Sequence, residues 1–292
     1  MPESERHTGQ TSKRSTLSRD LTIGILVALC AGCAGGSGID SATTSPPAPS
    51  TPAYPASAAN ARPKTGVLPN ETLKVNGVER EYRLVVPASV DLSKPVPLVF
   101  AFHGLGDSKD LMPIYTLLDV AAAQRGFILV YPNGRLRAWP LLEVLAKDDL
   151  AFFDALYAKL TTEYAVDQDR VFLTGMSNGA YFCHLLGALR SEKIAAIATH
   201  SGGLGTVDFK NLTPASQYGV LIVHGAQDGL VKVDEGRRAR DAYQKAGHPV
   251  EYVEVERWGH LWAHVAGVNE RMWRFFSKHP RRKATPTLNA GK

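Results

Sequence analysis

Three residue types that together perform nucleophilic catalysis occur in the sequence in the order Ser177, Asp228 and His260. A serine hydroxyl attacks a carbonyl carbon efficiently only where a base such as histidine removes its proton, and a carboxylate then holds the imidazole in the required tautomer. Ser177 lies between Gly175 and Gly179 in a GxSxG pattern. This pattern alone is a weak signal, so the surrounding segments must decide whether the three residues form a catalytic triad.

Other histidines compete with His260 for the role of the base. His264 is the strongest competitor because it follows only four residues later. His103 and His224 each precede a glycine at the end of an apolar run, and we interpret them as residues that orient loops through hydrogen bonds. We therefore predict that His260 takes the proton of Ser177 and later donates it to the leaving group.

The carboxylate of the triad also has competitors. Asp228 ends the segment LIVHGAQD. Asp234 and Glu235 are interpreted as first-turn residues of the helix that follows, where negative charge suits the helix dipole. Asp148 and Asp149 are expected on the solvated face of another helix; the alternative is that one of them braces the loop around Trp139. Asp228 is therefore the predicted partner of the imidazole.

The segments that must position these residues alternate between short apolar runs and helical patterns. Predicted strands cover 80–87, 97–103, 126–132, 170–175, 194–200, 219–225 and 250–256. Predicted helices cover 141–164, 178–189, 234–246 and 268–279. Buried runs that alternate with amphipathic helices predict an α/β fold with a mostly parallel sheet and helices on both faces. Ligands of such sheets bind outside the carboxyl ends of the strands, where the candidate residues lie.

The turn around Ser177 has the local pattern of a nucleophile elbow. A sharp turn between a strand and a helix forces the serine into strained dihedral angles, and glycines on either side remove side chains that would clash. The helix that begins at Asn178 then directs free N–H groups toward a developing oxyanion. We predict the backbone N–H groups of Asn178 and Leu105 as the oxyanion donors. Strand, turn and helix in this order are typical of the α/β-hydrolase fold, which also orders its triad as serine, acid and histidine.

From about Leu68 to Lys278 the sequence resembles the exported esterases grouped with polyhydroxybutyrate depolymerases and feruloyl or acetylxylan esterases. The matching segments are FAFHGLGD, YPNG, VDQDRVFLTGMSNGAYF, LIVHGAQDGLV and WGHLW. The resemblance implies hydrolysis of an ester through an acyl-enzyme, without a metal or an organic cofactor, and it places the triad on Ser177, Asp228 and His260. The chain departs from the family pattern at Ala180 and in the loop 261–264, which lacks the usual Pro-Gly.

Several aromatic residues near the predicted strand ends are candidates for the substrate pocket. They are His103, Tyr131, Trp139, Trp258 and Trp262. Such rings suit an aromatic acyl group, although buried aromatic residues more often belong to a core. The identity of the acid is therefore left open by the sequence.

The composition excludes a broad polyanion-binding surface. The 292 residues are 44% hydrophobic, enough for a full core, and the net charge is +5. The last thirteen residues carry four of these charges and residues 1–20 carry one, so residues 21–279 are neutral overall. No nucleic-acid partner is expected.

The N-terminal region has the pattern of an export signal. Basic residues precede an apolar run at 21–32 that is short for a membrane span, and Cys33 ends a lipobox-like LCAGC. We expect a signal over 1–33, with Cys33 as the site of lipid attachment; the alternative is an ordinary cleaved signal peptide. Residues 34–66, rich in Pro, Ser and Ala, are expected to form a disordered tether, which leaves a lipid anchor as the sole membrane contact.

Residues 67–279 are expected to form a single, minimal catalytic domain without a large lid, followed by a disordered basic tail at 280–292. Cys183 would then be the sole cysteine of the domain and is interpreted as a small core residue. The predicted function is that of an exported serine carboxylic-ester hydrolase acting on a small or oligomeric ester. The alternatives are a serine peptidase of the same fold and a catalytically silent binding protein at the cell envelope. The oligomeric state is not encoded in any pattern we recognise.

Overall fold

Eight strands form one sheet in the computed structural model, which describes residues 63–209 and 214–281. The strands are β1 (Gly66–Val75), β2 (Val78–Val86), β3 (Val96–Phe102), β4 (Ile128–Pro132), β5 (Val166–Met176), β6 (Ala196–His200), β7 (Gly219–Gly225) and β8 (Val250–Val255). The α-helices are α1 (Met112–Thr116), α2 (Leu118–Arg125), α3 (Lys147–Glu163), α4 (Asn178–Leu189), α5 (Val233–Lys245) and α6 (Val268–Lys278). Short 3-10 helices are η2 (Arg135–Arg137), η3 (Glu143–Leu145) and η4 (His264–Ala266). The predicted export signal with Cys33, nearly all of the tether and the end of the basic tail lie outside the described residues.

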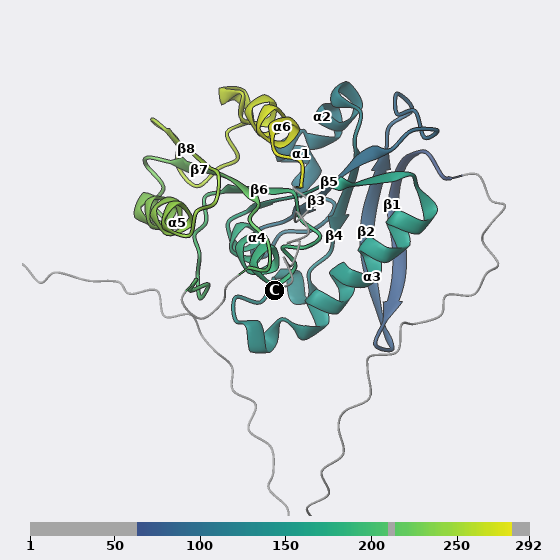
Figure 1. Ribbon diagram of the computed structural model, residues 1–292, viewed down its shortest axis with the longest axis horizontal. Coiled ribbons are helices and arrows are strands. Elements are labelled where there is room, and N and C mark those ends of the chain that lie inside the picture. The colour runs from purple at the N-terminus through teal and green to yellow at the C-terminus, as the bar shows by residue number, and fades with distance from the viewer. Residues whose placement is uncertain (1–62, 210–213, 282–292) are drawn as a thin grey trace, which may run out of the picture. The chain divides into compact units, whose positions relative to one another are not determined.

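The sheet is mostly parallel, as the sequence predicts. Its strand order is β1-β2-β4-β3-β5-β6-β7-β8 (Figure 1). Strands β4, β3, β5, β6, β7 and β8 run parallel, whereas β1 and β2 form an antiparallel hairpin whose second strand pairs antiparallel with β4. This arrangement confirms the predicted α/β-hydrolase architecture.

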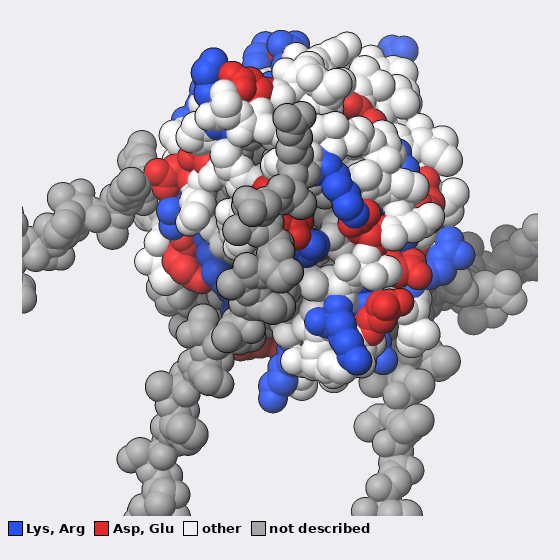
Figure 2. Space-filling view, turned by 90° about the vertical axis from the view of Figure 1, so that its right-hand side faces the viewer, with Lys and Arg blue, Asp and Glu red and all other residues white. Residues whose placement is uncertain are grey.

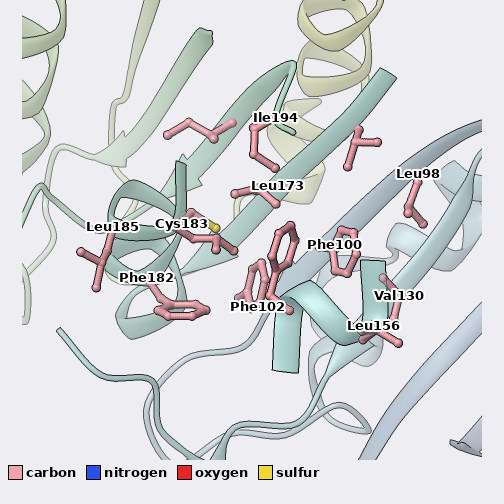
Figure 3. Packing of buried hydrophobic residues seen from close by; sticks show 14 of the residues in the cluster. Leu98, Phe100, Phe102, Val130, Leu156, Leu173, Phe182, Cys183, Leu185 and Ile194 are labelled. Atoms are coloured by element: carbon pink, nitrogen blue, oxygen red, sulfur yellow. The ribbon is translucent and has the colours of Figure 1, made fainter. Parts of the chain in front are cut away.

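Two layers of core residues cover the sheet because side chains of a strand alternate between its faces. In β3, Leu98, Phe100 and Phe102 belong to the core under α3, α4 and α5, whereas Val99 and Ala101 belong to the core under α1, α2 and α6. Figure 3 shows the first of these cores, where the rings of Phe100, Phe102 and Phe182 lie between sheet and helices. Both faces of the central strands are therefore buried, which explains their continuous apolar runs.

The structure differs from the expected elements in three places. Strand β1 precedes the first predicted strand, β2, and the two form a hairpin that turns at Asn76 and Gly77, both with positive φ. Helices α1 and α2 occupy a region where none was expected, separated by Leu117 in the left-handed conformation. The helix expected from residue 141 begins at Lys147, and its first turns are replaced by irregular chain and η3. The Asn-Gly dipeptide is a strong hairpin signal that could have revealed the first of these.

The expectation that Asp149 lies on a solvated helix face is wrong. Its carboxylate is buried and accepts a hydrogen bond from Arg80 at 2.6 Å, while Arg80 also donates to the carbonyl of Asn133 at 3.2 Å. The helix period alone did not reveal this pair because Arg80 lies 69 residues away, on the inward face of β2. Neighbouring Asp148 is exposed and pairs with Arg135. The buried pair fixes the turn that follows β4.

Charges of both signs are interspersed on the face of the domain shown in Figure 2, without a continuous region of one sign on that face. Within residues 63–209 and 214–281, no helix has both the length and the apolar character needed to cross a bilayer.

Two buried histidines make the fold sensitive to acid. His184 on α4 and His200 at the end of β6 are completely enclosed, and burial lowers the pKa of each from 6.5 to about 3. The unfolded chain takes up a proton at each site as the pH falls below 6.5, whereas the folded chain does not. Stability is therefore complete above pH 6.5 and declines toward pH 3. At pH 5 each histidine should lower the free energy of unfolding by ~2 kcal/mol relative to pH 7.5.

This loss can be measured by urea unfolding at pH 7.5 and pH 5. His184→Gln replaces the imidazole by a neutral group that can still bond the Tyr243 hydroxyl, which lies 3.0 Å from His184 Nδ1. The variant should reduce the difference between the two pH values by ~2 kcal/mol. An unchanged difference would show that His184 takes up its proton in the folded state.

Candidate active site

Ser177 occupies a strained turn between β5 and α4. Its φ of 55° and ψ of −117° are unusual for a residue with a side chain, and its backbone N–H donates to the carbonyl of His200 at 2.9 Å. A Cβ on Gly175 would lie 2.5 Å from backbone atoms of Gly179, and a Cβ on Gly179 would lie 2.1 Å from the carbonyl oxygen of Phe102. The two glycines are therefore required by close backbone contacts, as expected from the sequence.

Asp228 and His260 form a hydrogen-bonded pair. His260 Nδ1 lies 2.8 Å from Asp228 Oδ2, and Asp228 Oδ1 accepts the backbone N–H groups of Leu230 and Val231 at 2.9 and 2.8 Å. Burial would raise the pKa of the Asp228 carboxyl, but the bonds from Val231, His260 and Leu230 outweigh it and hold this pKa below its ordinary value of 3.8. The carboxylate is thus ionised at neutral pH, with Oδ2 facing the imidazole of His260.

The structure separates His260 from its competitors. His264 begins η4, its backbone N–H donates to the carbonyl of Trp262, and its Nδ1 has no hydrogen-bond partner among the described residues. His224 Nε2 lies 2.9 Å from the carbonyl of Val231 and 3.4 Å from Asp228 Oδ2, the same carboxylate oxygen that faces His260. His260 remains the predicted base.

The rival carboxylates have structural partners. Asp234 and Glu235 lie in the first turn of α5, as expected, where they form ion pairs with Arg237 and Arg238. Asp228 thus remains the predicted acid of the triad.

Sheet register brings the three segments to one edge. Met176 pairs with His200, His200 pairs with Val223, and His224 pairs with Glu254, so β5, β6, β7 and β8 end side by side. Within the described part of the chain, the Ser177 hydroxyl makes no hydrogen bond, to His260 or to any other residue. Catalytic hydrogen bonds of free enzymes are often long and tighten when substrate binds.

The loop after β3 lies against the elbow. A Cβ on Gly104 would lie 3.7 Å from Ser177 Cβ, and the backbone N–H of Leu105 has no protein acceptor in the described residues. Asn178 is the first residue of α4, whose leading N–H groups lack partners within the helix. Both predicted oxyanion donors therefore flank the serine with their N–H groups free of partners in the loop and the helix.

Buried polar contacts fix this loop. His103 Nε2 accepts the N–H of Gly134 at 3.0 Å and its Nδ1 lies 2.8 Å from the carbonyl of Gly104. The side chain of Asn178 bonds both backbone groups of Trp139, and Trp139 Nε1 donates to the carbonyl of His103. Sequence reasoning identified the Asn178 N–H but missed its side chain, which nothing in the local pattern distinguishes.

The predicted aromatic pocket is largely part of the core. His103, Tyr131, Trp139 and Trp262 are all buried, and the Tyr131 hydroxyl donates to Asp119. Trp139 packs against both Phe102 and Phe182 rather than toward solvent, which corrects the expectation that these four rings line a substrate pocket. Trp258, half-buried against the second core, keeps its place as a candidate. The sequence did not indicate which aromatic side chains near the strand ends face the site and which face the core.

Trp262 connects the histidine loop to the nucleophile elbow, a role that sequence reasoning missed. Its indole stacks on the imidazole of His200 with ring centres 3.6 Å apart, and the carbonyl of His200 holds the N–H of Ser177. Trp262 Nε1 donates to Asn269 Oδ1 at 2.8 Å, and Asn269 Nδ2 donates to the carbonyl of Thr116 at 2.7 Å. The contacts anchor the loop two residues beyond His260.

Replacing Asn269 with leucine should lower kcat for a short p-nitrophenyl ester by about tenfold to a hundredfold with little change in KM, because misplacing a catalytic group is costly. The control is Ser277→Ala on the same helix, where the hydroxyl bonds the carbonyl of Trp273 away from the loop. Equal kcat values for the two variants would show that Asn269 does not position His260.

Within residues 63–209 and 214–281, the remaining nucleophile and ligand types do not form a second centre. Cys183 is buried in the core, and burial raises the pKa of its thiol well above the ordinary value, as expected of an inert core residue. No three His, Cys, Asp or Glu side chains of the described residues are arranged to hold a metal ion.

The central part of the chain is similar to a known protein family. Residues 80–217, which run from within β2 to beyond β6 and include the nucleophile elbow, match the model of the family described as Esterase PHB depolymerase. The resemblance predicted from the sequence is thereby confirmed. Feruloyl esterase C of Emericella nidulans is 32% identical over 180 residues, which are 59% of this chain and 63% of that protein. The chain thus spans a little under two thirds of this relative's length.

Solved structures share the fold of this chain. A ferulic acid esterase from Anaeromyces mucronatus superposes with a TM-score of 0.57 at 18% identity, covering 74% of this chain and 90% of that one. An acylaminoacyl peptidase from Pyrococcus horikoshii has the same TM-score at 15% identity and covers 75% of this chain, but only 43% of the peptidase. The fold alone therefore does not separate ester from amide hydrolysis.

Proposed function

We propose that the domain hydrolyses carboxylic esters through an acyl-enzyme on Ser177. The observation that carries the proposal is the strained Ser177 turn at the same sheet edge as the hydrogen-bonded pair of Asp228 and His260. This is the arrangement of nucleophile, base and orienting acid that acyl transfer requires.

The reaction proceeds in two halves. Ser177 Oγ attacks the ester carbonyl carbon while His260 Nε2 takes the hydroxyl proton, and the resulting oxyanion accepts the N–H groups of Leu105 and Asn178. The carbon–oxygen bond of the ester then breaks, and the imidazolium gives its proton to the leaving alcohol. Water, deprotonated by His260, attacks the acyl-enzyme, and the acid leaves as Ser177 regains its proton. Asp228 stays ionised throughout and stabilises the imidazolium.

Similarity to proteins named as esterases favours an ester over an amide as the substrate of this chain. The curated proteins that match this chain at 25–32% identity include feruloyl esterases and a bifunctional acetylxylan esterase/xylanase. The likeness to peptidases is one of fold at 15% identity. We also propose that the protein is exported, because basic residues precede an apolar run within residues 1–33. Lipid attachment at Cys33 is a further part of this proposal.

A direct comparison of substrates tests the proposed reaction. Short p-nitrophenyl esters and aminoacyl anilides with matched acyl groups are assayed with the same preparation. We expect kcat/KM for the ester to exceed that for the anilide by more than about a hundredfold after correction for their uncatalysed rates. Anilide turnover equal to or above ester turnover would favour the peptidase, and the absence of both would favour a binding protein.

A further inference from the structure

An apolar cleft opens beside the proposed oxyanion loop. It has a volume of about 340 Å³ and is lined by Leu105, Gly106, Asp107, Leu111, Ile114 and Tyr115. Leu105 is 73% exposed and Ile114 is 70% exposed, which is unusual for large apolar side chains that lie together. The cleft begins one residue beyond Gly104, where an added Cβ would lie 3.7 Å from Ser177 Cβ. A bound ester carbonyl would therefore have this apolar surface next to it.

The two polar groups that line the cleft satisfy each other. The Tyr115 hydroxyl donates to Asp107 Oδ2 at 2.6 Å, and Asp107 Oδ1 accepts the N–H of Ser108, also at 2.6 Å. No donor of this pair is left to bind a charged or strongly polar substituent. The Asp107 carboxylate would repel an anionic one. An uncharged, apolar group is the occupant that this lining suits.

The position of the cleft in the sheet indicates which half of an ester it receives. His260 must reach the leaving alcohol, and its loop follows β8, on the β6 side of the elbow strand β5. The cleft is lined by the loop after β3, the neighbour of β5 on the other side, and by α1. Besides Ser177 Oγ and the oxyanion, the tetrahedral carbon carries the acyl group and the alcohol oxygen, which point in different directions. With the alcohol on the His260 side, the acyl group is directed toward the cleft.

We infer that this cleft is the acyl-binding site and that it selects esters of uncharged, apolar acids. The inference rests on the proposed ester hydrolysis and adds the acyl side of the substrate to it. A methylene transferred fully from water into an apolar site corresponds to roughly fourfold in kcat/KM. We therefore expect p-nitrophenyl butyrate to exceed the acetate by about tenfold.

The test compares this butyrate-to-acetate ratio between the full-length wild-type protein and Ile114→Ser. The Ile114 side chain is exposed, so the substitution should leave the fold intact, which thermal unfolding verifies. The matched control is Val67→Ser, at an apolar side chain on the edge strand β1 that is 49% exposed and does not line the cleft. A parallel series of ethyl, butyl and hexyl acetates varies the alcohol instead of the acid.

The expected result is a ratio reduced to about twofold or less in Ile114→Ser, an unchanged ratio in Val67→Ser and unchanged discrimination among the alcohols. An unchanged ratio in Ile114→Ser would overturn the acyl site, as would a change confined to the alcohol series. A kcat/KM for p-nitrophenyl hemisuccinate as high as that for the butyrate would overturn the selection against charged acyl groups. Failure of the wild-type protein to hydrolyse any of these esters would instead contradict the proposed function.

Discussion

Ser177→Ala should lower kcat/KM for ester substrates by at least about four orders of magnitude while the protein remains folded. The nucleophile is lost, and the backbone of the turn is held by Gly175 and Gly179 rather than by the serine side chain, which makes no hydrogen bond within the described residues. The free energy of unfolding should change by less than about 1 kcal/mol. Steady-state kinetics and urea unfolding measure the two quantities.

Ser201→Ala provides a matched control. Ser201 follows the neighbouring strand β6, is buried, and has a φ of 52°, close to the 55° of Ser177. Its loss should change kcat/KM by no more than about threefold, since it takes no part in the proposed reaction. If Ser177→Ala kept near-normal activity, or if the two variants lost activity equally, Ser177 would not be the nucleophile.

Asp228→Asn should lower kcat/KM by about three to four orders of magnitude. An amide Nδ2 in place of the accepting Oδ2 would oppose the Nδ1–H of His260, favour the wrong tautomer and provide no charge to stabilise the imidazolium. The remaining amide oxygen can still accept hydrogen bonds from the backbone N–H groups of Leu230 and Val231, so the loop should keep its conformation. Kinetics with a p-nitrophenyl ester, together with near-ultraviolet circular dichroism, separates loss of catalysis from loss of fold.

The same substitution has a defined pH signature in stability. Because the pKa of Asp228 lies below 3.8, its ionised form stabilises the fold above about pH 4, and this contribution is lost as the pH falls through the lowered pKa. Wild type and Asp228→Asn should therefore converge in stability at low pH. The control Asp234→Asn, in the exposed first turn of α5, should retain activity within about twofold. Comparable losses from both substitutions would contradict a specific role for Asp228.

Local pattern was sufficient to predict the sheet and the elbow. Apolar runs marked most parallel strands, and GxSxG after a buried strand marked a turn whose glycines now have identified backbone contacts. Asp228 and His260 were chosen because both follow predicted strands, and strands that end at one edge bring distant residues together. These predictions depend on periodicities of a few residues, which a single sequence displays directly.

Contacts between distant segments were not predictable in this way. The stacking of Trp262 on His200 joins residues 62 positions apart, and the bond from Asn269 to the carbonyl of Thr116 spans 153. The aromatic side chains near strand ends were expected to face substrate, but burial beneath the loops keeps Trp139 in the core. Such choices depend on how loops cross the sheet edge, which composition and spacing do not encode.

Fluorophosphonate labelling followed by peptide mass spectrometry tests directly whether Ser177 is an activated nucleophile, because the reagent phosphonylates a serine that a neighbouring base activates. We expect one adduct, on Ser177, that forms in the folded protein and is lost in Asp228→Asn and after heat denaturation. A folded protein that takes up no label, or that takes it up on Ser201 or another serine while Ser177 stays free, would contradict it.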